Sequence, residues 1–195
     1  LRNIQTRGGS EALGERLALS EKLSSFFSNR YPDQNVKSYR EFYDNTLRLL
    51  RSKDLASFDL GKEPAAMREK YGLSKFGQGC LLARRLVETG VRYVEVATDG
   101  WDMHNNLQSD MEDLSPSFDQ AYAALISDLD NRGMLDSTLV VLATEFGRKP
   151  QFNGNGRGHY PICFSSVLAG GGVKRGFVHG ASDKEGAYPE DPVTV

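Results

Sequence analysis

Apolar residues recur at helical spacing through the first part of the chain. Between positions 13 and 27 they stand three or four apart, and the run stops at Tyr31-Pro32, where the proline disfavours a continuing helix. A second stripe follows, made up of Tyr39, Phe42, Tyr43, Leu47 and Leu50. The pattern predicts helices in both places, and neither holds a cluster of catalytic residue types. We interpret residues 1–72 as a helical covering segment.

From residue 73 helical and β-rich stretches alternate. One helix is predicted from Ser74, a good N-cap, to Gly90, and another from Ser115-Pro116 to Gly133. Apolar runs predict strands at 91–97, 138–144 and 162–169, and the three glycines at 170–172 predict a hairpin turn. This alternation predicts that residues 73–195 form an α/β core, with a mostly parallel sheet between helices.

The composition is that of an ordinary soluble globular protein. A net charge of −2 and a hydrophobic content of 39% give no sign of nucleic-acid binding, and no apolar run is long enough to cross a bilayer. Cys80 and Cys163 are too few and too far apart for a disulfide framework or a zinc site, so core positions are expected for both. The chain begins at Leu1 in polar sequence, which we interpret as a fragment of a longer protein.

Candidate metal ligands stand in two loops that each follow a predicted strand. Asp102 and His104 are two residues apart, so extended backbone points both side chains the same way. Glu145 and His159 belong to the second loop, 145–161, which is too polar and glycine-rich for a helix or strand. These ligand types favour zinc, manganese or iron, and calcium is a further candidate. In the alternative interpretation Asp102 caps a turn, His104 is a solvated loop residue and Glu145 pairs with Arg148.

The second loop also has the features of an anion-binding site. Arg148, Lys149 and Arg157 supply positive charge, and the glycines at 154, 156 and 158 allow backbone donors to approach an anion. A flexible, positively charged surface loop is the competing interpretation. Trp101 either walls a pocket or fixes its loop to the core, and no nucleophile motif is visible.

Three segments together resemble a known bacterial family. They are the stretch from Glu145-Phe-Gly-Arg148 to Arg157-Gly-His159-Tyr-Pro, the motif Gly-Trp101-Asp102-Met-His104-Asn105, and Leu168-Ala-Gly-Gly-Gly-Val-Lys174. In this order they are similar to the sulfatase-like domain of unknown function 1501, and the resemblance runs from about Leu13 to the last residue. That family is placed in the alkaline phosphatase and sulfatase superfamily. The resemblance therefore implies a doubly wound, mostly parallel sheet with helices on both faces.

The resemblance also implies roles for individual residues. Asp102, His104 and His159 match one metal site of the superfamily, and Glu145 matches the carboxylate that opens a second. Glu145-Phe146 stands where active members usually have Asp-His, so this second site is incomplete. The superfamily's Ser or Thr nucleophile would come from an N-terminal part that this chain lacks. Export signals in many family members imply a periplasmic or cell-surface location.

These observations predict a metal-dependent hydrolase of sulfate or phosphate esters. Glu145, Arg148 and Arg157 are the candidate catalytic residues, and Arg148, Arg157, Asn105 and Lys149 are the candidate substrate contacts. The alternative is a non-catalytic envelope protein that binds anionic glycans on a degenerate hydrolase scaffold. A small-molecule or glycan ester is the expected partner, and self-association is also possible.

Overall fold

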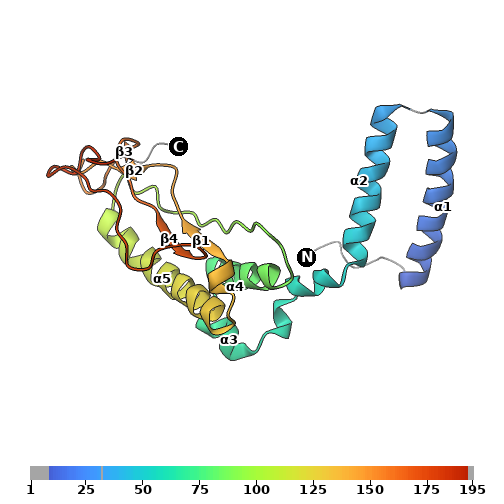
Figure 1. The fold of residues 1–195 in the computed structure, drawn as a ribbon, viewed down its shortest axis with the longest axis horizontal. Helices are drawn as coiled ribbons and strands as arrows, with labels where there is room; N and C mark the ends of the chain where they lie inside the picture. Colours follow the sequence, from blue (N-terminus) through green and yellow to red (C-terminus); the bar gives the residue numbers. More distant parts are fainter. Residues whose placement is uncertain (1–8, 32, 193–195) are drawn as a thin grey trace. The chain divides into compact units, whose positions relative to one another are not determined.

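The computed structural model describes residues 9–31 and 33–192, which form two compact units (Figure 1). The boundary between the units lies at Asp59 and Leu60, whereas the sequence placed it after residue 72. Residues 60–70 belong with the second unit because their short helices pack against α4 and α5.

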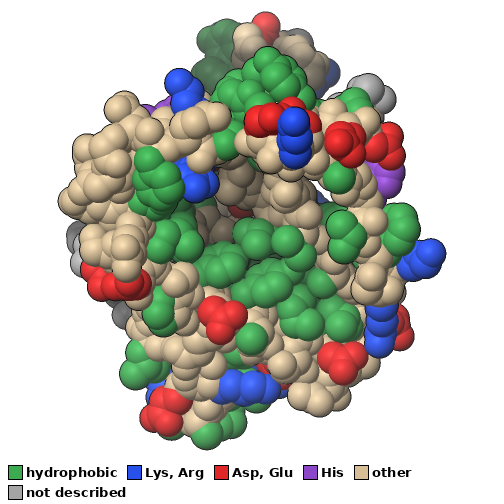
Figure 2. All heavy atoms as spheres, turned by 90° about the vertical axis from the view of Figure 1, so that its left-hand side faces the viewer, with side chains coloured by type: hydrophobic (Ala, Val, Ile, Leu, Met, Phe, Trp, Pro, Cys, Tyr) green, Lys and Arg blue, Asp and Glu red, His purple; other side chains and the backbone are tan. Residues whose placement is uncertain are grey.

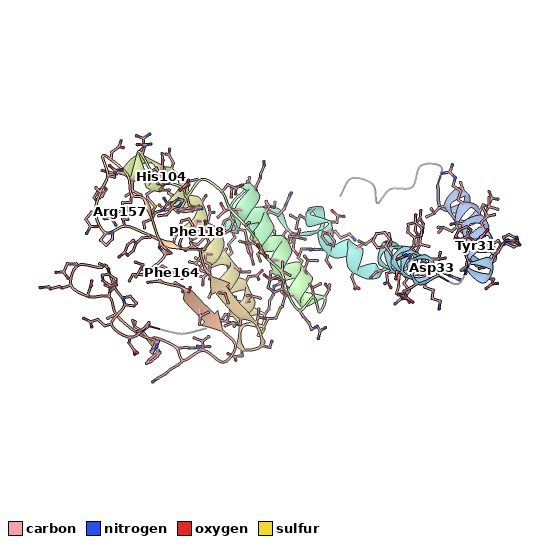
Figure 3. All side chains as sticks on the ribbon, turned by 90° about the horizontal axis from the view of Figure 1, so that it is seen from above. Tyr31, Asp33, His104, Phe118, Arg157 and Phe164 are labelled. Atoms are coloured by element: carbon pink, nitrogen blue, oxygen red, sulfur yellow. The ribbon has the colours of Figure 1, made fainter. Side chains whose placement is uncertain are left out.

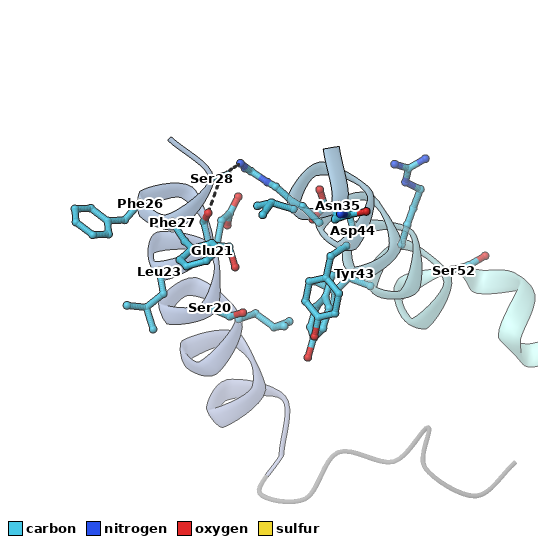
Figure 4. A pocket seen from close by; sticks show the side chains of 17 residues that line it. Ser20, Glu21, Leu23, Phe26, Phe27, Ser28, Asn35, Tyr43, Asp44 and Ser52 are labelled. Atoms are coloured by element: carbon cyan, nitrogen blue, oxygen red, sulfur yellow. Dashed lines mark hydrogen bonds between the residues drawn. The ribbon is translucent and has the colours of Figure 1, made fainter. Parts of the chain in front are cut away.

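The first unit is a pair of helices, as predicted. Helix α1 spans Gly9–Arg30 and α2 spans Gln34–Arg51, followed by the 3-10 helix η1, Lys53–Phe58. Pro32 of the predicted break lies outside the described residues, and α1 ends at Arg30. Figure 4 shows the groove between the helices, which Arg40 spans by donating a 3.2 Å hydrogen bond from Nη1 to Ser28 Oγ. Several aromatic side chains of this pair are exposed: Phe26, Phe27, Tyr39, Phe42 and Tyr43.

The second unit begins with helices. They are η2 (Leu60–Lys62), α3 (Ala65–Lys70), α4 (Lys75–Glu88), α5 (Leu107–Asn131) and η3 (Leu135–Ser137). Ser74 caps α4 as predicted, since its Oγ accepts a 3.0 Å hydrogen bond from Gly77 N. The predicted start of the next helix at Ser115 is wrong: α5 begins at Leu107, and Pro116 lies inside it. Asn106, with a left-handed φ of 54°, marks the true beginning.

The core of this unit lies between α4 and α5. Tyr71, Cys80, Leu81, Ala121 and Ala124 form its buried cluster. The alanines on α5 leave room for α4 to approach, so a small set of side chains closes the interface. The prediction for Cys80 is confirmed, since it is 3% exposed. Cys163 is half-buried in a bend and does not open a strand.

Arg84 is buried beside this core and joins three parts of the chain. Its guanidinium lies 2.9 Å from both Glu63 and Asp128 and 2.7 Å from Glu88. Tyr71 donates a 3.0 Å hydrogen bond from its hydroxyl to Asp128 Oδ2. A buried charge needs such partners because desolvation alone would be very unfavourable. Sequence periodicity gave no sign of this network, since it treats arginine as a surface residue.

The predicted doubly wound, mostly parallel sheet is wrong. The described residues contain only two small antiparallel sheets. One pairs β1 (Leu139–Leu142) with β4 (Val167–Gly170), and the other pairs β2 (Gly147–Arg148) with β3 (His159–Tyr160). Parallel pairing needs a crossover, usually a helix, but the chain between β1 and β4 holds only the β2–β3 hairpin. Strand β4 therefore pairs with β1 in the antiparallel direction.

Other strand predictions fail in part. Residues 91–97 make no ladder with any described strand, and of residues 162–169 only the end joins β4. Residues 173–179, which follow the predicted hairpin turn at 170–172, form no strand either. Among the described helices, none is both long and apolar enough to span a membrane.

Candidate metal centre

The first ligand loop, around residues 101–104, is tightly folded, and its successive side chains alternate between an exposed and a buried side. Met103 N donates to Trp101 O at 2.9 Å, and His104 N donates to Asp102 O at 3.0 Å, which are γ-turn hydrogen bonds. Met103 points inward and is 3% exposed, whereas Asp102 and His104 are exposed on the other side. The Trp101 ring packs edge-on against Phe118 of α5 at 5.7 Å, and this contact fixes the loop to the helix.

The second ligand loop is a β-hairpin, contrary to the prediction of irregular structure. Strands β2 and β3 pair Gly147 with Tyr160 and Arg148 with His159. A tight inner turn follows at 153–156, where Asn153 N donates to Gly156 O at 2.9 Å. The sequence did not indicate this pairing, because each strand has only two residues in the ladder and the segment between them is rich in glycine.

The two loops dock main chain against main chain. Arg157 N donates to Met103 O at 3.1 Å, and Leu107 N donates to Asn155 O at 3.0 Å. Gly156 is buried against the first loop, where a Cβ would lie 2.1 Å from the carbonyl oxygen of His104. Only glycine permits this approach, so the sequence Asn-Gly-Asn-Gly serves loop docking. Figure 3 shows His104 and Arg157 near each other at one end of this unit.

Docking brings three ligand-type side chains together: Asp102, His104 and His159. Asp102 Oδ1 lies 2.8 Å from His159 Nε2 and 3.2 Å from His104 Nε2, and the two ring nitrogens are 3.0 Å apart. All three side chains are open to solvent, with exposed fractions of 67%, 48% and 45% respectively. We call these residues the Asp-His-His cluster.

Hydrogen bonding alone does not satisfy this cluster. The carboxylate oxygen only accepts, and each Nε2 either carries one hydrogen or offers one lone pair. If both imidazoles donate to Asp102, their two N–H groups face each other at 3.0 Å. If one Nε2 is unprotonated, its lone pair faces the carboxylate oxygen at 2.8 Å or 3.2 Å. A cation among the three atoms would satisfy every lone pair at once.

Arg148 positions the cluster by hydrogen bonds to both loops. Its Nη2 donates to Asp102 Oδ1 at 2.7 Å and to Trp101 O at 3.0 Å, and its Nη1 donates to Arg157 O at 3.1 Å. One guanidinium thus joins both loops. Hydrogen bonds from His159 and then Arg148 lower the pKa of Asp102 to about 2. The carboxylate is therefore ionised over the physiological range.

The other candidates lie outside this cluster. Glu145 is exposed, does not join the three ligand atoms, and makes no hydrogen bond or ion pair with another described residue. Arg148 pairs with Asp102, so the alternative pairing with Glu145 does not occur. Lys149 and Asn105 are exposed within the loops. Arg157 lies over the Phe152 ring at 4.5 Å, and its Nε has no partner among the described residues.

Sequence reasoning missed Phe146. Its ring centroid is 4.2 Å from that of His159, so it packs against the imidazole and limits its rotation. The alternation of side chains along the hairpin could have indicated this contact. Phe146 and Arg148 are two residues apart and share one side of the hairpin, and the β2–β3 register places His159 opposite Arg148.

The structure thus defines a helix-rich protein with an exposed Asp-His-His cluster where two docked loops meet. The chain belongs to the family described as "Protein of unknown function (DUF1501)", which matches residues 3–195. No curated protein and no solved structure matches the chain.

Proposed function

We propose that this protein binds one divalent transition-metal ion through Asp102, His104 and His159 and uses it to hydrolyse sulfate or phosphate esters. The observation that carries the proposal is that three potential ligand atoms, one carboxylate oxygen and two imidazole nitrogens, lie within 4.8 Å of one another. The motif resemblance to the alkaline phosphatase and sulfatase superfamily supports this choice of reaction, but the proposal does not extend to that superfamily's sheet.

The donor set fits zinc, manganese or iron better than calcium. Ligands at zinc distances of about 2.0–2.1 Å in tetrahedral geometry stand roughly 3.3 Å apart. The separations in the cluster, 2.8–3.2 Å, are only a few tenths of an ångström shorter. Two imidazoles and one carboxylate also leave positions open for water or substrate, as in catalytic sites. Calcium prefers six to eight oxygen ligands, so two nitrogens among three donors are a poor match.

The residues around the cluster have separate tasks in this proposal. A bound divalent ion polarises an ester oxygen and lowers the pKa of water. Arg148 orients Asp102 and links the loops, and its side-chain donors are largely occupied by these contacts. Phe146 restrains His159. We assign the Arg157 guanidinium, which lies over the Phe152 ring and makes no ion pair with a described residue, to the oxygens of a sulfate or phosphate group, through its Nη groups because its Nε is buried.

Metal analysis of purified protein tests the binding step. After chelation and reloading with zinc or manganese, the wild-type chain is expected to retain about one ion, as a single three-ligand site requires. Asp102→Ala and His159→Ala are expected to lose affinity by more than the roughly 10–100-fold that loss of an outer-shell partner costs. His179→Ala is the matched control because His179 is an exposed histidine outside the cluster. Equal, negligible metal in all four proteins would refute the site.

Turnover of aryl sulfate and aryl phosphate by the intact protein tests the reaction. Activity that requires added metal and disappears in Asp102→Ala supports hydrolysis. Retained metal binding without turnover of either ester would leave the binding site intact and overturn the hydrolase assignment. A periplasmic or cell-surface location belongs to the same proposal and is checked by cell fractionation.

The openness of the cluster favours a second candidate, a non-catalytic binder of anionic glycans. Asp102 is two-thirds exposed, and a water-filled site weakens the electrostatic stabilisation that catalysis needs. Phe152 is 60% exposed and carries the Arg157 guanidinium on its ring, which offers a flat apolar surface beside a positive charge. Binding of a sulfated polysaccharide without ester turnover, lost in Arg157→Gln, would select this function.

A further inference from the structure

Helices α1 and α2 form a hairpin that has no core of its own. Only residues 31–33 stand between the two helices, a connection typical of antiparallel helical neighbours. Although both helices contain apolar residues at helical spacing, no described residue of either helix is buried. Isolated helices are marginal in water, and most helical stability in proteins comes from packing of an apolar face. The hairpin therefore needs a partner that covers its apolar residues.

Each helix carries an apolar face that the other helix does not cover. On α1, Leu19, Leu23 and Phe26 are spaced by four and three residues, so they lie on one side of the helix. Figure 4 shows Leu23 and Phe26 directed away from α2. All three side chains are exposed. The corresponding face of α2 is made of exposed aromatic residues: Tyr39, Phe42 and Tyr43.

The groove between the helices has room for a further helix. Its volume is about 1370 Å³, and Leu17, Phe27 and Tyr43 are among the residues that line it (Figure 4). Three turns of a helix about 10 Å wide, at a rise of 1.5 Å per residue, fill roughly this volume. An amphipathic helix that lays its apolar face into such a groove would bury these side chains.

We propose that α1 and α2 bind the same two helices of a second copy of this chain, so that two hairpins enclose a common core as a four-helix bundle. Five exposed rings supply most of the contact: Phe26, Phe27, Tyr39, Phe42 and Tyr43. At roughly 150–250 Å² for each fully buried ring, their exposed parts come to about 600 Å² per copy. Leu19 and Leu23 bring this area near the roughly 800 Å² per partner that a specific interface buries.

The distribution of charge suits a partner that is identical. A two-fold interface brings a surface against its own copy, so a surface rich in one sign of charge would repel itself. Helix α1 has three acidic and three basic residues. The charged residues of α2 recur at helical spacing on the side away from Tyr39 and Tyr43. They include Lys37, Arg40, Glu41, Asp44 and Arg48.

The second unit also exposes apolar side chains, and these form the competing surface. Figure 2 shows hydrophobic side chains gathered around a hollow on this unit. Leu139 and Val141 of β1 and Leu168 of β4 are each about half exposed. Unlike the hairpin, this unit already has a buried core between α4 and α5, so it does not depend on a partner for one.

Sedimentation of the chain of residues 1–195 at increasing concentration tests the pairing. A species of about twice the 21.6 kDa of one chain is expected, with a dissociation constant of about 1 μM or tighter, as for interfaces of this area. Amide hydrogen exchange supplies a second readout on the unchanged protein. As the dimer forms, amides of α1 and α2 are expected to exchange at least about tenfold more slowly, whereas those of α4 keep their rates.

Substitutions on the two apolar faces locate the contact. Phe26→Glu and Phe42→Glu place a charge where a single chain is exposed but the dimer is buried. Each is expected to raise the dissociation constant at least roughly thirtyfold, the effect of losing a strong interface residue. Tyr93→Glu is the matched control, because Tyr93 is an exposed aromatic residue of the second unit, and it is expected to leave association unchanged.

Three results would overturn the proposal. The first is a single-chain mass at every concentration, with exchange in α1 and α2 that does not depend on concentration. The second is association that survives both Phe26→Glu and Phe42→Glu but is lost in Val141→Glu, which would assign the interface to the β1–β4 sheet. The third is a chain that stays single and binds vesicles of phosphatidylcholine and phosphatidylserine in equal parts, since a lipid surface would then cover the hairpin.

Discussion

Gly156 and His104 touch through their main chains, and a Cβ on Gly156 would lie only 2.1 Å from the His104 carbonyl oxygen. Gly156→Ala is therefore expected to push the hairpin away from the first loop, to weaken zinc binding at least tenfold or so, and to lower the melting temperature. Calorimetric titration with zinc and thermal unfolding measure the two effects.

Gly158→Ala provides the comparison for this clash. A Cβ there would lie 3.6 Å from the Lys149 side chain, at ordinary van der Waals distance. Its zinc affinity and melting temperature are expected to match the wild type. If the Gly156→Ala and Gly158→Ala proteins behave alike, close docking of the loops is not what assembles the cluster.

Arg148 positions the Asp-His-His cluster through hydrogen bonds. A substitution that keeps the charge but not these hydrogen bonds distinguishes this role from a purely electrostatic one. Arg148→Lys keeps the positive charge but cannot donate from a planar fork to Asp102, Trp101 O and Arg157 O together. Zinc affinity is expected to fall roughly 10–100-fold, as for other outer-shell partners. Arg157→Gln leaves the cluster contacts of Arg148 in place and is expected to bind zinc like the wild type. If zinc affinity fell in Arg157→Gln and not in Arg148→Lys, Arg157 would be the residue that positions the cluster.

Arg84 stabilises the second unit through its buried ion pairs. Arg84→Ala would remove the buried cation that Glu63 and Asp128 share and leave each with one cation, at a cost near the lower end of about 3–5 kcal/mol in the free energy of unfolding. Urea denaturation measures this change. Arg175→Ala is the exposed counterpart: its 3.5 Å contact with Asp136 is solvated on both sides, so a change within about 0.5 kcal/mol is expected.

The same network makes stability depend on pH in the acid range. Burial acts to raise the pKa of Glu63, but hydrogen bonds and charge from Arg85 and Arg84 outweigh it and hold the pKa below its ordinary value. For Asp128 burial is likewise outweighed, by Arg132, Tyr71 and Arg84. A folded-state pKa that is lowered gives stability above the unfolded-state pKa, and this stability is lost as the pH falls further.

The unfolding free energy is therefore expected to be steady near neutrality and to decline as the pH falls below about 4, the ordinary carboxyl range. Urea denaturation at stepped pH measures the decline. Arg84→Ala should make the decline shallower, because Glu63 and Asp128 would lose one of the cations that lower their pKa values while Arg85 and Arg132 remain. An equally steep decline in that variant would assign the acid sensitivity to other groups.

Local patterns in the sequence were sufficient for much of the helical structure. The Ser74 cap and the ending glycine at position 90 predicted the bounds of α4 to within two residues, since the start and stop signals agree there. The start of α5 was missed because proline is most familiar in a first helical turn, whereas Pro116 lies further along. Asn106 carried no comparable signal, because a left-handed φ is not visible in the sequence.

The sheet was predicted wrongly for a different reason. Strand propensity at 91–97 was real, but pairing depends on which other strands are present and on how the chain returns. The sequence placed Asp102, His104 and His159 in two loops that each follow a predicted strand, whereas the structure brings them together by docking a hairpin on a γ-turn loop. Three of the four predicted metal ligands lie together and Glu145 does not, while the architecture used to place them was incorrect.

The β2–β3 ladder has a consequence for how this protein tolerates change. It consists of two residue pairs, and one of them places His159 opposite Arg148. Adding or deleting a single residue between them would turn the imidazole to the reverse side of the ribbon, away from Asp102. Many substitutions in residues 149–158 leave the imidazole where it is, but the number of residues in that stretch is fixed.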